Sequence, residues 1–216
     1  AYLKAHFPTE FMTALMCSDC GDTDRIVLEI NECEEMGINV LPPSVNESFV
    51  NFTMVEDKKV RFGLIAIKGV GEGPVKEIIS ARKVTGEPFK DMEDFCRRVS
   101  FTVINKKLIQ AMALSGAFDE FGDRNQISES YEEISKYARY VQESQAQGQT
   151  DIFGALVDQG VEEEQGFYFR NVPKATELEK LKGEKDFLGL YVSNHPLHGL
   201  QKYLKKKGTL VSELSE

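Results

Sequence analysis

The chain has 216 residues, of which 41% are hydrophobic and 28% are charged, so its composition is that of a globular protein and excludes disordered and low-complexity classes. No apolar stretch approaches the roughly 20 residues that span a bilayer, and we therefore expect a cytoplasmic protein with no membrane partner. The formal net charge of -9 argues against nucleic acid as a partner of the chain as a whole.

The first quarter of the chain is predicted to be helical and then to form short strands. A helix is expected over residues 3–18, and Pro8 inside it marks where the regular helix starts. Thr23 and Asp24 can cap a second helix, which Gly37 ends. The apolar period then changes to short runs typical of strands, at residues 38–41, 49–55 and 59–62.

Helical spacing returns after Gly63. Val75, Ile78 and Ile79 repeat at i, i+3 and i+4 behind Pro74, which suits the first turn of a helix. Further helices are predicted over residues 91–99, 105–114, 125–143 and 175–189. The predicted fold class is therefore mainly α with a small β element.

Positive charge gathers in one part of this acidic chain. Residues 58–107 hold twelve Lys and Arg side chains against six Asp and Glu side chains, whereas the remainder is strongly acidic. Such an island can steer a polyanion to one place. A solvated helical surface is the simpler explanation on charge alone.

Residues 65–79 have the pattern of a helix-hairpin-helix. An apolar first helix is expected to end in Gly69-Val70-Gly71, where the glycines permit positive φ and Val70 anchors the turn. Backbone N–H groups of the turn and of the next helix then form an anion site, which the helix dipole strengthens. Lys68 and Lys76 flank it, and Gly73 lies beside it. A site of this kind holds phosphate and reads no base.

Two other interpretations of these glycines stay open. A dinucleotide-binding turn would place an acidic residue such as Asp91 or Asp94 about 20 residues further on, although the G-x-G-x-G spacing and Pro74 do not fit that pattern. A plain tight turn is the second alternative. A phosphate loop is excluded because no Gly-Lys-Ser/Thr follows.

A second, degenerate hairpin is predicted over residues 104–119. It again places an apolar helix before a glycine, Gly116, and it carries Lys106 and Lys107 near its start. Paired hairpins can touch both strands of a duplex. The candidate DNA-binding residues are Lys68, Gly69, Val70, Gly71, Gly73, Lys76, Lys106 and Lys107.

No metal site or catalytic site is predicted in the chain. Cys17 and Cys20 have the spacing of half a zinc site, with His6 and Cys33 as conceivable partners, but no second pair follows. The stretch Asp22-Thr-Asp24 is interpreted as a helix-capping turn and not as paired catalytic carboxylates. We therefore expect no cofactor here, and no catalysis by this segment alone.

A short peptide follows a glutamine-rich linker. Its adjacent bulky side chains could anchor in an apolar pocket of a partner, and its amide side chain could orient it. A linker whose apolar residues pack under the neighbouring helix is favoured by the residues alone. The peptide comprises Gln149, Thr150, Asp151, Ile152 and Phe153.

Several longer motifs together resemble the alpha subunit of bacterial DNA polymerase III. They occur in the family's order and cover nearly the whole chain: Ala1–Met12, Glu32–Asn46, Phe62–Glu72, Ser115–Asp119 and Leu188–Leu197. The chain does not begin with Met, and we expect it to be a segment of such a protein.

The resemblance implies three parts. Residues 1–57 would be the end of the fingers domain with short strands, residues 58–124 a tandem helix-hairpin-helix unit that binds duplex DNA, and residues 125–216 the clamp-binding region leading toward an OB-fold. The peptide Gln149–Phe153 falls where the family binds the sliding clamp, with Ile152 in place of the commoner Leu or Met. The parent would be a DNA-directed DNA polymerase.

The resemblance also implies what lies outside the chain. The Mg²⁺ ions of the parent polymerase would be held by palm carboxylates upstream, and other replisome subunits would be partners through the parent protein. An independent hairpin-containing DNA-repair or scaffolding protein is the alternative from a different class.

Overall fold

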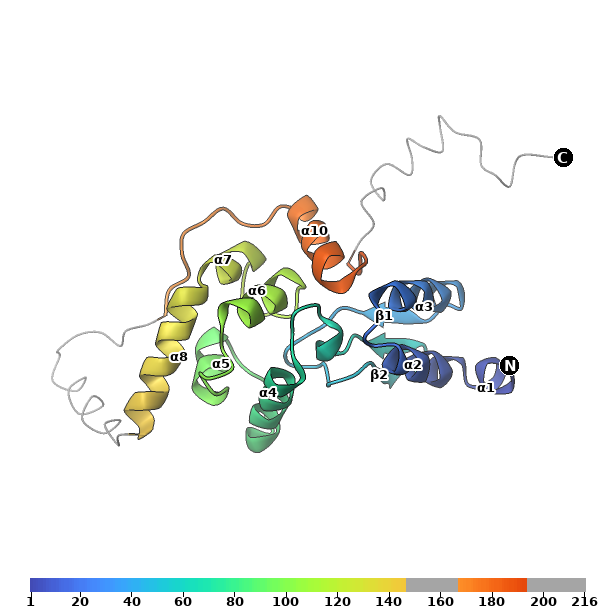
Figure 1. The fold of residues 1–216 in the computed structure, drawn as a ribbon, viewed down its shortest axis with the longest axis horizontal. Helices are drawn as coiled ribbons and strands as arrows, with labels where there is room; N and C mark the ends of the chain where they lie inside the picture. The colour runs from blue at the N-terminus through green and yellow to red at the C-terminus, as the bar shows by residue number, and fades with distance from the viewer. Residues whose placement is uncertain (147–166, 194–216) are drawn as a thin grey trace, which may run out of the picture.

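The computed structural model describes residues 1–146 and 167–193, and these residues are mainly helical with one small sheet (Figure 1). This confirms the predicted fold class. The elements in chain order are α1 Tyr2–His6, α2 Pro8–Ser18, α3 Thr23–Glu35, β1 Asn39–Leu41, β2 Thr53–Glu56, β3 Lys59–Arg61, the 3-10 helix η1 Leu64–Ala66, α4 Glu72–Thr85, α5 Met92–Arg98, α6 Lys106–Leu114, α7 Arg124–Glu129, α8 Tyr131–Ala146 and α10 Glu177–Leu188.

The first predicted helix is divided in two. Phe7 leaves the helical conformation (φ -136°, ψ 61°), and Pro8 then opens α2, where its missing N–H costs no hydrogen bond. Asp22 caps α3 by accepting a hydrogen bond from the backbone N–H of Arg25 at 3.2 Å. The stretch Asp22-Thr-Asp24 is therefore a capping turn, as predicted, but the cap is Asp22, whereas the predicted caps Thr23 and Asp24 lie in the first turn of the helix.

The three strands form one sheet in the order β1-β3-β2. Strand β3 pairs in parallel with β1, where Val40 lies opposite Val60, and antiparallel with β2. The central strand thus follows residue 57 in the chain while both its partners precede it. The sheet spans the expected boundary between residues 57 and 58, and the three-part division remains a prediction.

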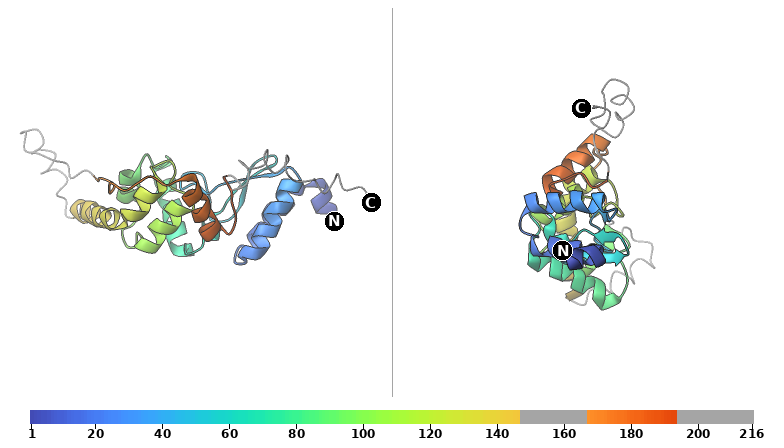
Figure 2. Two further views of the ribbon diagram at one scale, coloured as in Figure 1. Left: turned by 90° about the horizontal axis from the view of Figure 1, so that it is seen from above. Right: turned by 90° about the vertical axis from the view of Figure 1, so that its right-hand side faces the viewer.

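The molecule is elongated, with α1 to α3 toward one end and α8 toward the other (Figure 2). The connection between β1 and β2 joins the sheet to the helices. Asn46 exchanges two hydrogen bonds with the backbone of Phe89, donating at 3.0 Å and accepting at 2.8 Å. Arg82 on α4 donates to the carbonyl groups of Val45 and Ser48. Backbone contacts of this kind fix the helical unit against the sheet.

The buried face of α3 contains a carboxyl group. Glu29 lies among Ile26, Ile30 and Cys33 on that face, beside Asp19 at the end of α2. Burial, and next a hydrogen bond with Asp19, raise the pKa of Glu29 to about 7.

Glu29 should make the stability of the chain depend on pH. Because its pKa in the fold lies above the value near 4.3 of a free Glu side chain, the fold favours the protonated form, and stability is lost as the pH rises from about 4.3 to about 7. We expect the melting temperature of Glu29→Gln minus that of the wild type to increase between pH 5 and pH 8. Glu35→Gln, at an exposed position of α3, is the control. A difference that is independent of pH would contradict this prediction.

Candidate nucleic-acid interface

The first hairpin begins with a shorter helix than the sequence predicts. A single 3-10 turn, η1, precedes the glycines, and its Leu64 is buried together with Ile67. Val70 is also buried and anchors the turn to the core, as expected. The second helix of the hairpin, α4, begins at Glu72 with Gly71 as its N-cap. The predicted first helix of this hairpin is thus reduced to one 3-10 turn, and Gly63 before it lies against the backbone of Asn51 and Phe52.

The glycines of this turn differ in what they require. Gly69 has a φ of +93°, a conformation that favours glycine. Gly71 has a φ of -92°, so the positive φ that the glycines permit is adopted at Gly69 and not at Gly71. A Cβ atom added at Gly71 would meet only Pro74, at 3.7 Å, and one added at Gly73 would meet nothing within 4 Å. These two glycines therefore leave the backbone uncovered.

Four backbone donors of the turn have no hydrogen-bond partner within the described part of the chain. They are the N–H groups of Gly69, Gly71, Glu72 and Gly73, and Pro74 has no N–H. The N-cap Gly71 has no side chain that could accept from them. Because α4 also directs the positive end of its dipole here, the turn can bind an anion such as a phosphate oxygen.

The structure brings one of the predicted lysines of α6 to this turn. A Cβ atom at Gly69 would lie 3.1 Å from Cε of Lys107, so the lysine side chain lies across the glycine. Lys68 has an exposed side chain, and its backbone N–H donates to the carbonyl oxygen of Phe187 at 2.8 Å. Residues from both predicted hairpins therefore meet at the first turn.

The other two lysines are partly engaged within the chain. Lys76 donates to the Glu72 carboxylate at 2.6 Å, and this hydrogen bond lowers the pKa of Glu72. Lys106 lies over the ring of Tyr131, with its Nζ 4.7 Å from the ring centroid. Both side chains remain exposed, so turning toward a phosphate would cost little free energy.

The second hairpin, α6 to α7, has a closed turn. Gly116 has a φ of +88°, but a Cβ atom there would lie 2.5 Å from Nη2 of Arg124. Asp119 forms a bidentate ion pair with Arg124 over this turn. The N–H groups of Gly116 and Ala117 already donate to carbonyl oxygens of α6. This turn therefore offers no open anion site, which sequence reasoning missed because Arg124 carries no local signal.

The alternative of a dinucleotide site is not supported. The 3-10 turn η1, and not a strand, precedes the glycines, so the strand-glycine-helix unit is not formed there. Asp91 caps α5 by accepting from the N–H of Asp94, and Asp94 pairs with Arg98 at 2.9 Å. Both acidic residues thus have structural partners.

Comparisons with known proteins agree with this geometry. The family of the helix-hairpin-helix motif matches residues 37–127. The chain is 39% identical over 206 residues to DNA polymerase III subunit alpha of Vibrio cholerae, which covers 95% of this chain and 18% of that protein. The corresponding proteins of Haemophilus influenzae and Escherichia coli are 40% and 36% identical, each over 95% of this chain and 17% of their own length.

This chain resembles a segment of DNA polymerase III subunit alpha. The match confirms the resemblance that the sequence motifs indicate, and the chain spans less than a fifth of the length of these alpha subunits. The helix-hairpin-helix match covers η1 to α7 and so includes both turns described above.

The clamp-binding peptide expected from the alpha-subunit resemblance, Gln149–Phe153, lies outside the described residues. Helix α8 precedes it, and the described residues that follow it contact the same helix. Phe167 packs against Tyr137 with ring centroids 6.0 Å apart. Arg170 forms ion pairs with Glu132 and Glu133 near the start of α8. Residues before and after the peptide are therefore anchored on the same helix.

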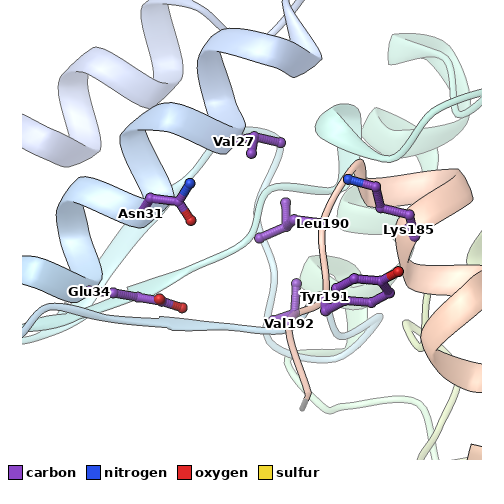
Figure 3. Close-up of a pocket in the computed structure, with 7 residues that line it drawn as sticks. All are labelled: Val27, Asn31, Glu34, Lys185, Leu190, Tyr191 and Val192. Carbon is purple, nitrogen blue, oxygen red and sulfur yellow. The ribbon is translucent and has the colours of Figure 1, made fainter. Parts of the chain in front are cut away.

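A pocket of about 380 Å³ lies between α3 and the residues that follow α10 (Figure 3). No residue of the glycine turn lines it, so it is separate from the candidate DNA site. It marks the place where the end of α10 approaches α3. Its lining residues are Val27, Asn31, Glu34, Lys185, Leu190, Tyr191 and Val192.

The cysteines have structural surroundings. Cys17 donates to the carbonyl oxygen of Phe52 at 3.2 Å, and burial raises the pKa of Cys33 to about 11. Among residues 1–146 and 167–193, no three His, Cys, Asp or Glu side chains are grouped so that they could hold a metal ion. In the same residues no helix has the length and apolar character needed to cross a membrane. The expectation of a segment without metal or cofactor stays a prediction.

Proposed function

We propose that this chain is part of a DNA polymerase III alpha subunit, in which it holds duplex DNA behind the polymerase active site and so supports processive replication. The observation that carries the proposal is the open turn at Gly69–Gly73, with unpartnered N–H groups and Lys107 lying across it. The whole protein would be a cytoplasmic DNA-directed DNA polymerase, whose Mg²⁺ ligands lie outside this chain.

The turn would hold one DNA strand by its phosphates. Phosphate oxygens would accept hydrogen bonds from the N–H groups of Gly71, Glu72 and Gly73, and Lys107 would add a positive charge beside them. Two of these three residues are glycines, so backbone groups would make most of these contacts, and contacts to phosphate carry no information about the bases. Binding is then independent of sequence, which suits a polymerase that moves along every template.

We also propose that Gln149–Phe153 binds the sliding clamp. One support is the resemblance to the alpha subunits. The other is that Phe167 and Arg170, which follow the peptide in the chain, contact α8 beside the helix-hairpin-helix unit. A clamp held by this peptide would stay close to the duplex that the hairpin binds. Other replisome subunits would join through the rest of the parent protein.

Replacement of Gly71 by Val should weaken binding to duplex DNA roughly tenfold. The extended conformation of Gly71 suits a β-branched residue, and its Cβ would find free space, so the fold should persist while the side chain covers the phosphate site. The factor corresponds to the loss of a charge-assisted hydrogen bond, about 1.5 kcal/mol. Binding is measured by fluorescence anisotropy with a labelled duplex over a series of salt concentrations, and the wild type should give a log-log slope of about -3 to -5.

Gly21→Val is the matched control, because Gly21 is exposed in the turn between α2 and α3 and a Cβ there meets nothing within 4 Å. Equal DNA affinity of the Gly71 and Gly21 variants, or binding that ignores salt, would show that the hairpin does not hold phosphate. An independent repair or scaffolding protein would pass this test but would not bind the clamp.

A further inference from the structure

Helix α10 is seated in the closed second hairpin. Gly183 lies so close to the end of α6 that a Cβ atom there would be 2.5 Å from the carbonyl oxygen of Leu114. The next residue, Glu184, is 1% exposed and accepts a hydrogen bond from Arg124 at 3.1 Å. The turn at Gly116 is thus covered by Arg124, which is paired with Glu184 of α10. The corresponding turn of the first hairpin, at Gly69–Gly73, is open.

The other end of α10 reaches the first hairpin. The carbonyl oxygen of Phe187, in the last turn of α10, accepts the hydrogen bond from the N–H of Lys68. The last four carbonyl groups of a helix lack partners within the helix, so this bond satisfies one of them. It also fixes the peptide unit between Ile67 and Lys68, one residue before Gly69, whose φ of +93° defines the turn.

The end of α10 is itself held in place from two sides. The second carboxylate oxygen of Glu184 accepts hydrogen bonds from the backbone of Val192 and Ser193, at 2.9 and 3.0 Å. Gly189 follows with a φ of +86°, and a Cβ atom there would lie 2.3 Å from Cγ2 of Thr23 on α3. The carbonyl group that meets Lys68 therefore has a fixed position relative to both hairpins.

We propose that α10 is a positioning element for DNA binding. The second hairpin binds α10 through Arg124 and Glu184, and α10 in turn holds Lys68–Gly71 in the conformation that accepts a phosphate. This rests on the proposed function of the first hairpin. Gly183 and Glu184 are then positioning residues that touch no DNA. A turn that is ordered before DNA arrives loses less conformational entropy on binding, and affinity is higher for that reason.

The test uses the whole chain with Gly183→Val, which forces α10 away from Leu114. We expect faster hydrogen exchange of the Lys68 amide, unchanged protection of the α4 amides of Ile78 and Ile79, and a fall in duplex affinity of about fivefold to tenfold. Leu178→Val is the matched control, because Leu178 lies on the same helix and is 71% exposed. A merely structural role would not change the Lys68 amide selectively.

Glu184→Gln is the second variant, and it carries the test if the Gly183 variant fails to fold. It keeps the shape of the side chain but removes the charge that faces Arg124. We expect faster hydrogen exchange of the Lys68 amide and weaker duplex binding, both to a smaller extent than in Gly183→Val. Wild-type DNA affinity together with a rapidly exchanging Lys68 amide would overturn the proposal, as would wild-type protection of that amide in both variants. If only Gly71→Val weakens DNA binding, the function stands and the role of α10 is wrong; if no variant does, the function itself is wrong.

Discussion

Replacement of Arg124 by Met is expected to lower the free energy of unfolding by about 3–5 kcal/mol, the usual cost of removing one partner of a buried ion pair. Burial alone would lower the pKa of Arg124, but hydrogen bonds and charges of Asp119 and Glu184 outweigh it and raise the pKa. Arg124 is 5% exposed, so the loss of its side chain leaves Glu184 buried without a cation. Chemical denaturation at neutral pH measures the change.

Two further variants decide whether the ion pair is the cause. Arg139→Met removes the same type of side chain at an exposed position where Arg139 lies over the ring of Phe101, and should cost less than about 1 kcal/mol. The double variant Arg124→Met/Glu184→Met should recover part of the loss, because apolar residues of similar volume often replace a buried ion pair without penalty. A double variant no more stable than Arg124→Met would attribute the loss to packing.

Local sequence signals place most helices of this chain correctly. Pro8 opens α2, and Asn105 accepts a hydrogen bond from the N–H of Leu108 and so begins α6 at the expected residue. Such signals work because a cap or a missing N–H acts within one helical turn. The first glycine turn is predictable for the same reason, because it requires a positive φ at Gly69 and glycine adopts that conformation without steric strain.

Contacts between distant segments decide what local signals cannot. The predicted helix over residues 125–143 is divided at Ser130, whose hydroxyl donates to Gln126 and accepts from the backbone N–H of Arg170, 40 residues away. Glu184 lies in a helix rich in charge, where a solvated side chain is the natural expectation. Its buried carboxylate is paired with Arg124, which lies 60 residues earlier in the chain, and accepts hydrogen bonds from the backbone of Val192 and Ser193.

The same limit applies to the candidate site. The glycines alone predict two comparable hairpins, yet one turn is open and the other is closed by Arg124 and Asp119. The side chain that crosses Gly69 belongs to Lys107, which the sequence assigns to the second hairpin. The sequence predicts Gly69 and Lys107 as members of two separate hairpins, and only the packing shows that the first turn of α6 lies beside the first hairpin.

The proposed clamp binding through Gln149–Phe153 would complement the DNA contacts that we propose for the first hairpin. Contacts to phosphate are sensitive to salt and break often, whereas a clamp that encircles the duplex keeps the effective concentration of the primer end high. Ile152 and Phe153 supply the apolar anchors for such a partner, and Gln149 supplies hydrogen bonds at the rim of a pocket.

Phe153→Ala should therefore have the largest effect on this interaction. Loss of a buried aromatic anchor costs about 2 kcal/mol or more, which is a fall of at least roughly 30-fold in affinity. Titration of purified clamp with a peptide of residues 146–155 measures it, and Thr150→Ala is the matched control, expected to bind like the wild type because the small side chain of Thr150 adds little to an apolar anchor. If the Phe153 and Thr150 variants bind alike, or if the wild-type peptide does not bind, the proposal of a clamp-binding peptide is wrong, and the alternative of a linker whose apolar residues pack under the neighbouring helix is favoured.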